Sequence, residues 1–305
     1  MAVMNKTRIK RSRGDLTFDI VNITISVLLL IIVAYPLYFV VIASISDPSA
    51  VSSGQVVLYP IDINLDGYKE VIGYEPIWSG YRNTIFYTIG YTFLSVMISL
   101  MSGFAFSRGN LPGKKIFLGI FIFTMFFNGG LIPTYLIVRN LGLYGNPIII
   151  ILLGAVNVNN IIISRTFIKS TIPEELFEAA ALDGCSHAKT FFRVVLPVSQ
   201  SLIAVLVLFA AVAQWNSWFN AMIYLNDENQ MPLQMILRDL IVNQSAMAMA
   251  SDAAASSGGD AAAAVLLVES MRYAVIIVSS LPLLCVYPFV QKYFVKGIMI
   301  GSVKG

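Results

Sequence analysis

Apolar residues gather along this chain in six long stretches that are separated by polar segments. A helix that crosses the hydrocarbon core of a bilayer needs about 20 predominantly apolar residues, and each stretch reaches that length. The pattern therefore predicts an all-α integral membrane protein with six transmembrane helices. The predicted spans are residues 20–45, 84–106, 116–138, 147–168, 198–224 and 273–294. The first is longer than the apolar region of a signal peptide, which favours a retained span.

The distribution of Lys and Arg predicts the orientation of these spans, because basic residues concentrate in cytoplasmic loops. With the N-terminus in the cytoplasm, 15 of the 20 Lys and Arg residues fall on the cytoplasmic side. Both termini are then cytoplasmic. A basic tail, residues 1–19, precedes a single membrane domain, residues 20–305. The extracellular segments are residues 46–83 and 225–272, the second with a surface helix expected after Pro232.

Composition agrees with this class and narrows the function. Of the 305 residues, 57% are hydrophobic and 12% are charged, whereas soluble domains carry about 25% charged residues. A net charge of +3 is too small to indicate a nucleic-acid partner. Cys185, Cys285 and the single histidine, His187, provide neither a disulfide framework nor a Cys/His zinc site, so no metal is expected.

The sequence shows no means of energising transport by itself. No ionisable residue lies near the middle of a predicted span, where ion-coupled carriers place such groups. The stretch GNLPGKK, Gly109 to Lys115, is one residue shorter than a phosphate-binding loop and lacks its Ser or Thr. We therefore expect a chain that is not an enzyme and that draws on a separate source of energy if it transports a solute.

A charged segment, IPEELFEAAALDGCSHAKTFFRVVLP, separates the fourth and fifth spans and runs from Ile172 to Pro197. Thr171 and Glu174 match a capping box, which predicts the start of a helix. The helix formers of LFEAAAL continue it, and Gly184 supplies a left-handed stop. A second helix then leads to Pro197 and the fifth span. The segment is thus predicted to be a cytoplasmic helix–glycine–helix elbow over residues 171–197.

The first helix of this elbow has an apolar stripe formed by Leu176, Phe177, Ala180 and Ala181. An amphipathic cytoplasmic helix can lie on the membrane surface. The polar face of this helix is acidic, however, and the inner leaflet is anionic. Docking into a groove of another protein is therefore the favoured interpretation.

The elbow resembles the EAA loop of type I ABC importer permeases. Glu178-Ala179-Ala180 is followed after three residues by Gly184, and after nine more by Val194-Val195-Leu196-Pro197, where the family has Ile-x-Leu-Pro. Val194 is the departure from that pattern. The stretches FAFSRGNLPGKK, QWNSWFNAMIYLND and VKGIMIGSVKG are similar to the carbohydrate-uptake branch, which includes the maltose-type second permease and the oligo- and polysaccharide permeases.

The resemblance implies a type I permease fold and a permease subunit that moves a carbohydrate across the cell membrane. It implies a heterodimer with a second permease subunit, two ATPase subunits below the membrane, and an extracellular solute-binding protein that contacts residues 225–272. ATP and Mg²⁺ would belong to the ATPase subunits, with no cofactor on this chain. The ATPase-docking positions carried over from the motif are Glu178, Ala179, Ala180, Asp183 and Gly184.

Two interpretations are open for the C-terminal tail. The resemblance implies a contact with the ATPase through Lys296 and Lys304. The alternative is a basic tail that only anchors the last span.

Polar and aromatic side chains within the spans are candidates for a sugar path. They are Asn157, Asn159, Asn160, Trp215, Asn216, Trp218 and Asn220. In a continuous helix, Asn216 and Asn220 would share one face and the tryptophans another. Amides and indoles suit hydroxyl-rich solutes. Packing between helices is the alternative for the asparagines, and anchoring at the membrane interface is favoured for the tryptophans.

Other function classes stay open on the residues alone: a permease for a solute other than a sugar, a polytopic membrane enzyme, and a carrier or channel that works by itself. An enzyme needs clustered acid, base or metal-binding groups, and the predicted spans contain few residues of these kinds. Co-purification of ATPase subunits and a second permease separates an importer subunit from the last two classes. The pattern does not distinguish a neutral sugar from an acidic one.

Overall fold

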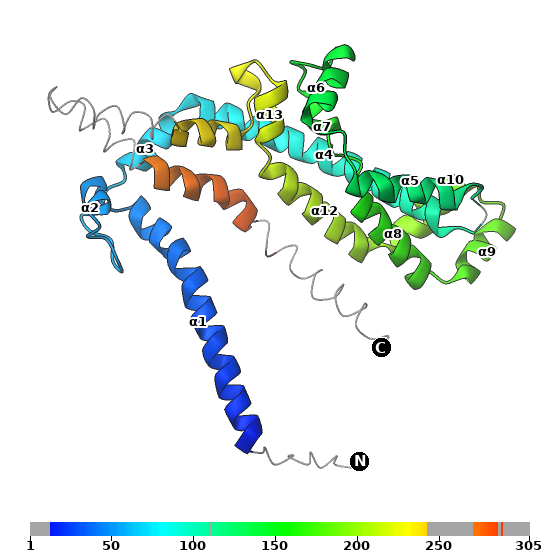
Figure 1. Cartoon of the computed structure of the whole chain (residues 1–305), viewed down its shortest axis with the longest axis horizontal. Coiled ribbons are helices and arrows are strands. Elements are labelled where there is room, and N and C mark those ends of the chain that lie inside the picture. The colour runs from blue at the N-terminus through cyan, green and yellow to red at the C-terminus, as the bar shows by residue number, and fades with distance from the viewer. Residues whose placement is uncertain (1–12, 110, 243–270, 286–287, 289–305) are drawn as a thin grey trace. The chain divides into compact units, whose positions relative to one another are not determined.

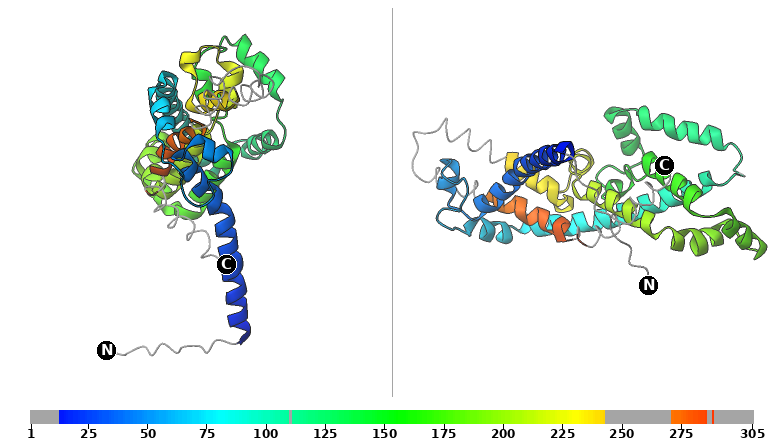
Figure 2. Two further views of the ribbon diagram at one scale, coloured as in Figure 1. Left: turned by 90° about the vertical axis from the view of Figure 1, so that its left-hand side faces the viewer. Right: turned by 90° about the horizontal axis from the view of Figure 1, so that it is seen from below.

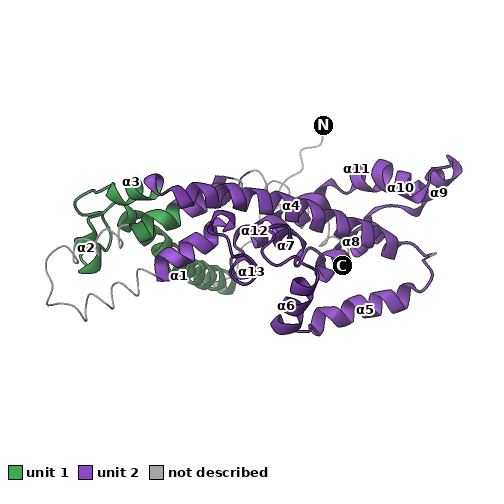
Figure 3. Cartoon of the chain, turned by 90° about the horizontal axis from the view of Figure 1, so that it is seen from above, with its two compact units in different colours: residues 1–71, 247–277 green, residues 72–246, 278–305 purple. Residues whose placement is uncertain are grey.

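The computed structural model describes residues 13–109, 111–242, 271–285 and 288, and all regular structure in these ranges is helical. The predicted all-α class is therefore confirmed. The chain divides into two compact units, which Figure 3 colours separately. The first comprises residues 1–71 and 247–277, and the second comprises residues 72–246 and 278–305.

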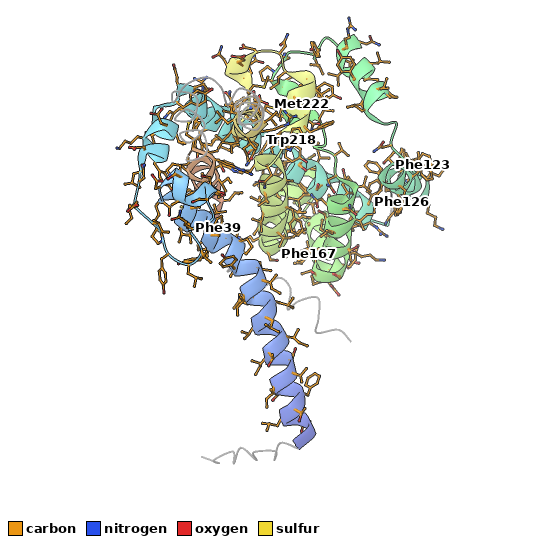
Figure 4. The ribbon with its side chains drawn as sticks, turned by 60° about the vertical axis from the view of Figure 1, so that its left-hand side comes forward. Phe39, Phe123, Phe126, Phe167, Trp218 and Met222 are labelled. Carbon is orange, nitrogen blue, oxygen red and sulfur yellow. The ribbon has the colours of Figure 1, made fainter. Side chains whose placement is uncertain are left out.

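The first unit begins with α1, Arg13–Ser44, a continuous helix of 32 residues (Figures 1 and 2). Its length, about 48 Å at 1.5 Å per residue, exceeds the roughly 30 Å of a bilayer's hydrocarbon core. Only 6% of its most apolar stretch of 18 residues is buried, and Figure 4 shows side chains projecting from both sides of the helix. A helix that is apolar all round needs an apolar solvent, so α1 fits a bilayer.

Two short helices follow α1 in this unit. Asp47 caps α2, Pro48–Ser52, because its side chain accepts hydrogen bonds from the amides of Ser49 and Ala50. The Ser49 hydroxyl, followed by these amides, holds the pKa of Asp47 below its ordinary value. The next helix, α3 (Asp66–Gly73), begins in this unit and ends two residues beyond its limit at residue 71. The apolar cluster of the unit consists of Ile42, Ala43, Ala50, Val51 and Val56.

The second unit is built around α4, Glu75–Ser107, which continues for 33 residues without a break. Two helices, α8 (Val158–Thr171) and α12 (Gln200–Trp215), pack along it. The contact with α8 is very close, since a Cβ atom on Gly103 would lie 2.4 Å from Cβ of Ser164. The approach of these helices therefore depends on the missing side chain of a glycine, as is common between membrane helices.

The main apolar core of the second unit forms where α4, α8, α12 and the elbow meet. Aromatic rings occupy its elbow side, where Phe104, Phe177 and Phe191 lie together. The buried members of this core are Val96, Leu100, Phe104, Ile168, Ile172, Phe177, Phe191, Val195, Leu202 and Leu206. The elbow is thus part of the folded core and not an appendage.

Three of the predicted spans are interrupted. In the third, α5 (Lys114–Phe126) and α6 (Leu131–Asn140) meet at 114°, and Figure 3 shows the two as separate helices. In the fourth, α7 (Ile148–Leu152) is separated from α8 by irregular residues 153–157. In the fifth, α12 ends before residues 216–218, and α13 (Phe219–Tyr224) follows.

Among the described residues, two helices, α1 and α4, are long and apolar enough to cross a membrane. The number becomes four if each of two bent pairs is one crossing. These pairs are α5 with α6, and residues 187–198 with α12, which meet at 86°. A shorter apolar helix, Met271–Cys285, overlaps the sixth predicted span.

A short 3₁₀ turn, Glu228–Gln230, leads from α13 to a helix over residues 233–242. A helix after Pro232 was predicted and is confirmed, but its predicted surface position is wrong. Gly80 of α4 makes room for it, because a Cβ there would lie 2.5 Å from Cδ1 of Ile236. The buried side chains of this helix are Leu233, Met235, Ile236 and Leu237.

Candidate functional site

The first limb of the predicted elbow is α9, Glu174–Leu182. It ends in a Schellman motif, in which two amides beyond the helix satisfy its last carbonyl groups. The Gly184 amide donates to Ala181 at 3.0 Å, and the Cys185 amide donates to Ala180 at 2.9 Å. Gly184 has a φ of 70°, a left-handed conformation that glycine adopts without strain. The predicted glycine stop is confirmed.

The second limb is one continuous helix over residues 187–198. It consists of α10 (His187–Thr190), a π-helical turn (Phe191–Val195) and α11 (Leu196–Val198). Ser186 caps it, since its hydroxyl accepts a hydrogen bond from the amide of Lys189 at 3.3 Å. The predicted second helix is therefore confirmed, and it meets α12 at an 86° corner.

The start of α9 differs from the prediction. Pro173 occupies the N-cap position and no side chain caps the helix, so the predicted capping box of Thr171 and Glu174 is wrong. Glu174 instead binds Arg108, the residue that ends α4. Nη1 and Nη2 of Arg108 donate to the two carboxylate oxygens of Glu174 at 3.0 Å and 2.7 Å. The Arg108 guanidinium also lies 4.0 Å from the centre of the Phe177 ring.

One face of α9 is buried in the second unit. Phe177 is only 6% exposed, and its ring stacks on Phe104 with the centroids 6.0 Å apart. Ala180 is also buried. The apolar stripe predicted to face outward is therefore wrong for Phe177 and Ala180, which face the chain itself, whereas Leu176 and Ala181 are exposed.

The opposite face of α9 and its glycine stop are open to the surroundings. We call this surface the elbow tip and define it as Glu178, Ala179, Leu182, Asp183 and Gly184, all of them exposed. Leu182 is 90% exposed and was not identified from the sequence. The elbow tip is thus a small acidic surface that includes an exposed leucine, and the buried face of α9 behind it holds it in place.

The asparagines of the fourth predicted span lie at the start of a helix. Asn157 is the N-cap of α8 and accepts a hydrogen bond from the amide of Asn160 at 3.1 Å. Asn160 is buried in the first turn, and Asn159 is exposed. The prediction that these residues occupy the middle of a continuous helix is wrong, because residues 153–157 interrupt it.

The asparagines of the fifth predicted span flank a second interruption. Asn216 ends α12, and Asn220 lies in the first turn of α13. Since the helix is broken between them, the prediction that they share one helix face is wrong. Asn216 is exposed, and its side-chain amide donates to the carbonyl of Val212 at 2.8 Å.

The two tryptophans have different environments. Trp215 is 6% exposed, packs against Tyr81, and donates from its indole nitrogen to the carbonyl of Ser279 at 3.4 Å. Interfacial anchoring is therefore wrong for Trp215. Trp218, labelled in Figure 4, lies at the surface with the guanidinium of Arg238 4.9 Å from its ring.

Replacing Trp215 by alanine is expected to lower the free energy of unfolding by about 3–5 kcal/mol, because a large buried side chain leaves a cavity. The matched change Trp218→Ala removes an exposed ring and a cation–π contact of about 0.5–1 kcal/mol. Thermal unfolding of the two purified variants in detergent measures the difference. Equal, small shifts in both would contradict a core position for Trp215.

Two groups of predicted site residues lie outside the described residues. One is the tail that contains Lys296 and Lys304, and the other is the part of the outer segment from residue 243 to residue 270.

Comparison with known proteins identifies the family. Residues 76–300 match the family described as binding-protein-dependent transport system inner membrane component. The chain belongs to this family. It is therefore a multi-pass protein of the cell membrane and the permease component of such a transport system. The matched region begins with α4 and includes the complete elbow.

Similar proteins cover nearly the whole permease. YtcP of Bacillus subtilis, named a polygalacturonan/rhamnogalacturonan transport system permease protein, is 35% identical over 94% of this chain and 98% of its own. LplC of the same organism is 35% identical over 96% of this chain and 97% of its own.

A solved structure of a bacterial ABC transporter involved in import of the acidic polysaccharide alginate contains a chain with the same fold. The TM-score is 0.83 at 34% identity, with 94% of this chain and 99% of that chain covered. The predicted resemblance to ABC importer permeases is confirmed.

Proposed function

We propose that this permease is a subunit of an ABC importer that moves fragments of an acidic polysaccharide into the cell. Six spans of the type I fold, with both termini in the cytoplasm, belong to the proposal. So do the partners: a second permease subunit, two ATPase subunits that carry ATP and Mg²⁺, and an extracellular solute-binding protein that contacts residues 225–272.

The elbow tip is the observation that carries the proposal of an ATPase partner. Its Leu182 is 90% exposed, and such exposure suits a surface that is covered in an assembly. Glu178 and Asp183 beside it complement a groove with a basic rim. Because α9 is fixed through Phe177, a movement of the bound partner would be passed to the membrane helices rather than absorbed by a loose loop.

The contacts with the ATPase are assigned accordingly. Glu178, Ala179, Asp183 and Gly184 meet the ATPase groove, with Glu178 opposite a basic group. Ala180, buried beneath, brings the backbone of α9 close to the core behind it. Lys296 and Lys304 form a second contact with the ATPase.

The nature of the substrate rests on the relatives. YtcP is named for polygalacturonan, a polymer of a sugar acid, and the solved relative imports the acidic polysaccharide alginate. Relatives named for neutral sugars, such as the melibiose/raffinose/stachyose permease MelC of Bacillus subtilis, are 25% identical. The higher identity of the former favours an acidic oligosaccharide over a neutral one.

The sugar path is assigned to the helix interruptions of the second unit. Residues 153–157 and 216–218 are irregular, and irregular backbone at membrane depth is tolerated where it is buried in protein or lines a polar cavity. Asn157, Asn160, Asn216 and Asn220 flank these breaks and supply amide groups for hydroxyl-rich solutes. Trp215 is left out, since its ring is buried in the core.

The test is ATP hydrolysis by the complete complex, reconstituted with its binding protein and given one glycan at a time. Oligogalacturonides and alginate oligosaccharides are the acidic probes, and maltodextrins are the neutral probe of matched length. We expect at least one acidic probe to stimulate hydrolysis and maltodextrins to have no effect. Stimulation by maltodextrins alone would overturn the acidic substrate, and the absence of ATPase subunits from the purified complex would overturn the importer.

A further inference from the structure

Helix α4 is unbroken, unlike the third, fourth and fifth predicted spans of the second unit. Its 33 residues extend about 50 Å, enough to cross a bilayer and project beyond it. The third, fourth and fifth predicted spans are all interrupted by bends or irregular residues. A displacement applied at one end of α4 therefore reaches the other end with little loss, which a hinged segment would not allow.

The N-terminal half of α4 is hydrogen-bonded to the outer segment. The buried hydroxyl of Thr84 accepts a hydrogen bond from the amide of Leu233 at 2.8 Å. Asn83 donates from its side-chain amide to the carbonyl of Asn229 at 2.7 Å. The Tyr87 hydroxyl donates to the carbonyl of Gln230 at 2.9 Å. These bonds fasten residues 229–233, part of the segment assigned to the binding-protein contact, to one end of α4.

The C-terminal end of α4 is fastened to the elbow by Arg108. Its bidentate pair with Glu174 fixes both the distance and the orientation of two planar groups. The same guanidinium covers Phe177, which stacks on Phe104 in the last turn of α4. Arg108, at the end of α4, thus contacts both the first turn of α9, through Glu174, and the buried face of α9, through Phe177.

The Arg108–Glu174 pair is suited to positioning more than to stabilising. The side chains of Arg108 and Glu174 are 26% and 65% exposed, and pairs near the surface contribute about 0–1 kcal/mol to stability. A lysine at the same place would keep the charge but would lose the planar fork. The geometry of the fork, rather than its charge alone, is therefore the property on which the orientation of α9 depends.

We propose that α4 is a strut that transmits the position of residues 229–233 to α9, and that Arg108 is the positioning residue at its elbow end. The strut deepens the function proposed above and rests on it. A change in the outer segment when the loaded binding protein docks shifts α4 along the core, and the Arg108–Glu174 fork carries that shift to the elbow tip. The ATPase is then stimulated only when the outer face is engaged.

The test compares four forms of the reconstituted complex with the wild type: Arg108→Lys, Arg108→Glu, Glu174→Arg, and the double exchange Arg108→Glu with Glu174→Arg. The readouts are basal ATPase activity, ATPase activity with the binding protein and the glycan that stimulates the wild type, and co-purification of the ATPase subunits. Glu175→Arg is the matched control, because Glu175 is exposed in the same turn of α9.

We expect the three single changes to reduce the stimulation about tenfold, within the usual range of coupling between sites, with basal activity and co-purification unchanged. The double exchange restores most of the stimulation, whereas Arg108→Lys does not, since it lacks the fork. Glu175→Arg keeps full stimulation. Full stimulation in the single variants overturns the proposal, and so does a loss that is accompanied by loss of the ATPase subunits.

A change at the other end of α4 tests the strut itself. Thr84→Val removes the acceptor for the Leu233 amide, and Thr84→Ser retains it. If both ends act through one helix, Thr84→Val lowers the stimulation, Thr84→Ser does not, and combining Thr84→Val with Arg108→Lys adds little to either change alone. If the combined variant instead loses stimulation by the product of the two single losses, the two ends do not act through one helix, and the proposal is overturned. A wild-type complex that no glycan stimulates would instead overturn the proposed function.

Discussion

Glu178→Lys is expected to abolish the stimulation of ATP hydrolysis while the permease still folds and reaches the membrane. Glu178 is exposed on the elbow tip and is absent from the buried face of α9, so the change leaves the core intact. A reversed charge against a basic groove costs about 2–5 kcal/mol, which corresponds to a loss of at least about 30-fold in affinity. The measurements are co-purification of the ATPase subunits and stimulated ATPase activity.

The matched control for this charge reversal is Glu175→Lys, one turn nearer the start of α9. Glu175 is also exposed but lies outside the elbow tip as defined above, so its reversal is expected to leave the stimulation within about twofold, as for rim charges that change affinity little. Membrane yield and detergent extraction of both variants should equal those of the wild type. Undiminished stimulation in Glu178→Lys would show that the elbow tip is not the docking surface.

Gly103→Ala is expected to prevent the permease from accumulating as a folded protein. An added Cβ would lie 2.4 Å from Cβ of Ser164 and 2.9 Å from the backbone nitrogen of Arg165, and backbone cannot move aside as a flexible side chain can. Overpacking of this kind costs about 1–3 kcal/mol, and more where helices must separate. The yield of monodisperse protein and its thermal unfolding in detergent measure the effect.

Gly119→Ala provides the comparison, because Gly119 lies in α5 and a Cβ there meets no atom within 4 Å. Alanine is favoured over glycine inside a helix by about 1 kcal/mol. The same substitution is therefore expected to be harmless or stabilising at residue 119 and strongly destabilising at residue 103. Similar unfolding temperatures for the two variants would contradict the close packing of α4 on α8.

The elbow could be predicted from the sequence because its signals are local. The helix formers of LFEAAAL precede Gly184, which is placed where a left-handed residue ends the helix, although the capping box predicted at its start was wrong. Such residues act through their own backbone preferences, whatever surrounds them. The Glu178-Ala179-Ala180 motif lies in this helix. The sequence therefore predicted both the family motif and the local shape of the segment that carries it.

The interruptions of the spans could not be predicted in the same way. Hydropathy depends on composition, and a broken apolar segment has nearly the composition of a continuous one. Gly130 and Gly154, both with positive φ, mark two of the breaks, but glycine is also common inside membrane helices. The break at residues 216–218 contains no glycine or proline. The sequence therefore contained no sign that the helix stops there, and the shared helix faces predicted for Asn216 with Asn220 and for the two tryptophans were wrong.

The Arg108–Glu174 pair could not be predicted from local sequence patterns for another reason. The two residues are 66 positions apart, and the same glutamate fits a capping box with Thr171. A bidentate guanidinium offers stronger hydrogen bonds than a single backbone amide. Glu174 therefore pairs with Arg108 and does not form the capping box with Thr171, and only the folded structure shows this pairing.

The π-helical turn in the second limb of the elbow contributes to the orientation of α9, together with the packing of Phe177 and the Arg108–Glu174 pair. Each residue of an α-helix advances the chain by about 100° around the axis, and a π turn accommodates one more residue than an α turn. Phe191–Val195 therefore rotates the residues before it relative to α12 by an amount that a regular helix of the same sequence length would not give. The number of residues in this one turn thus contributes to the direction in which the elbow tip faces.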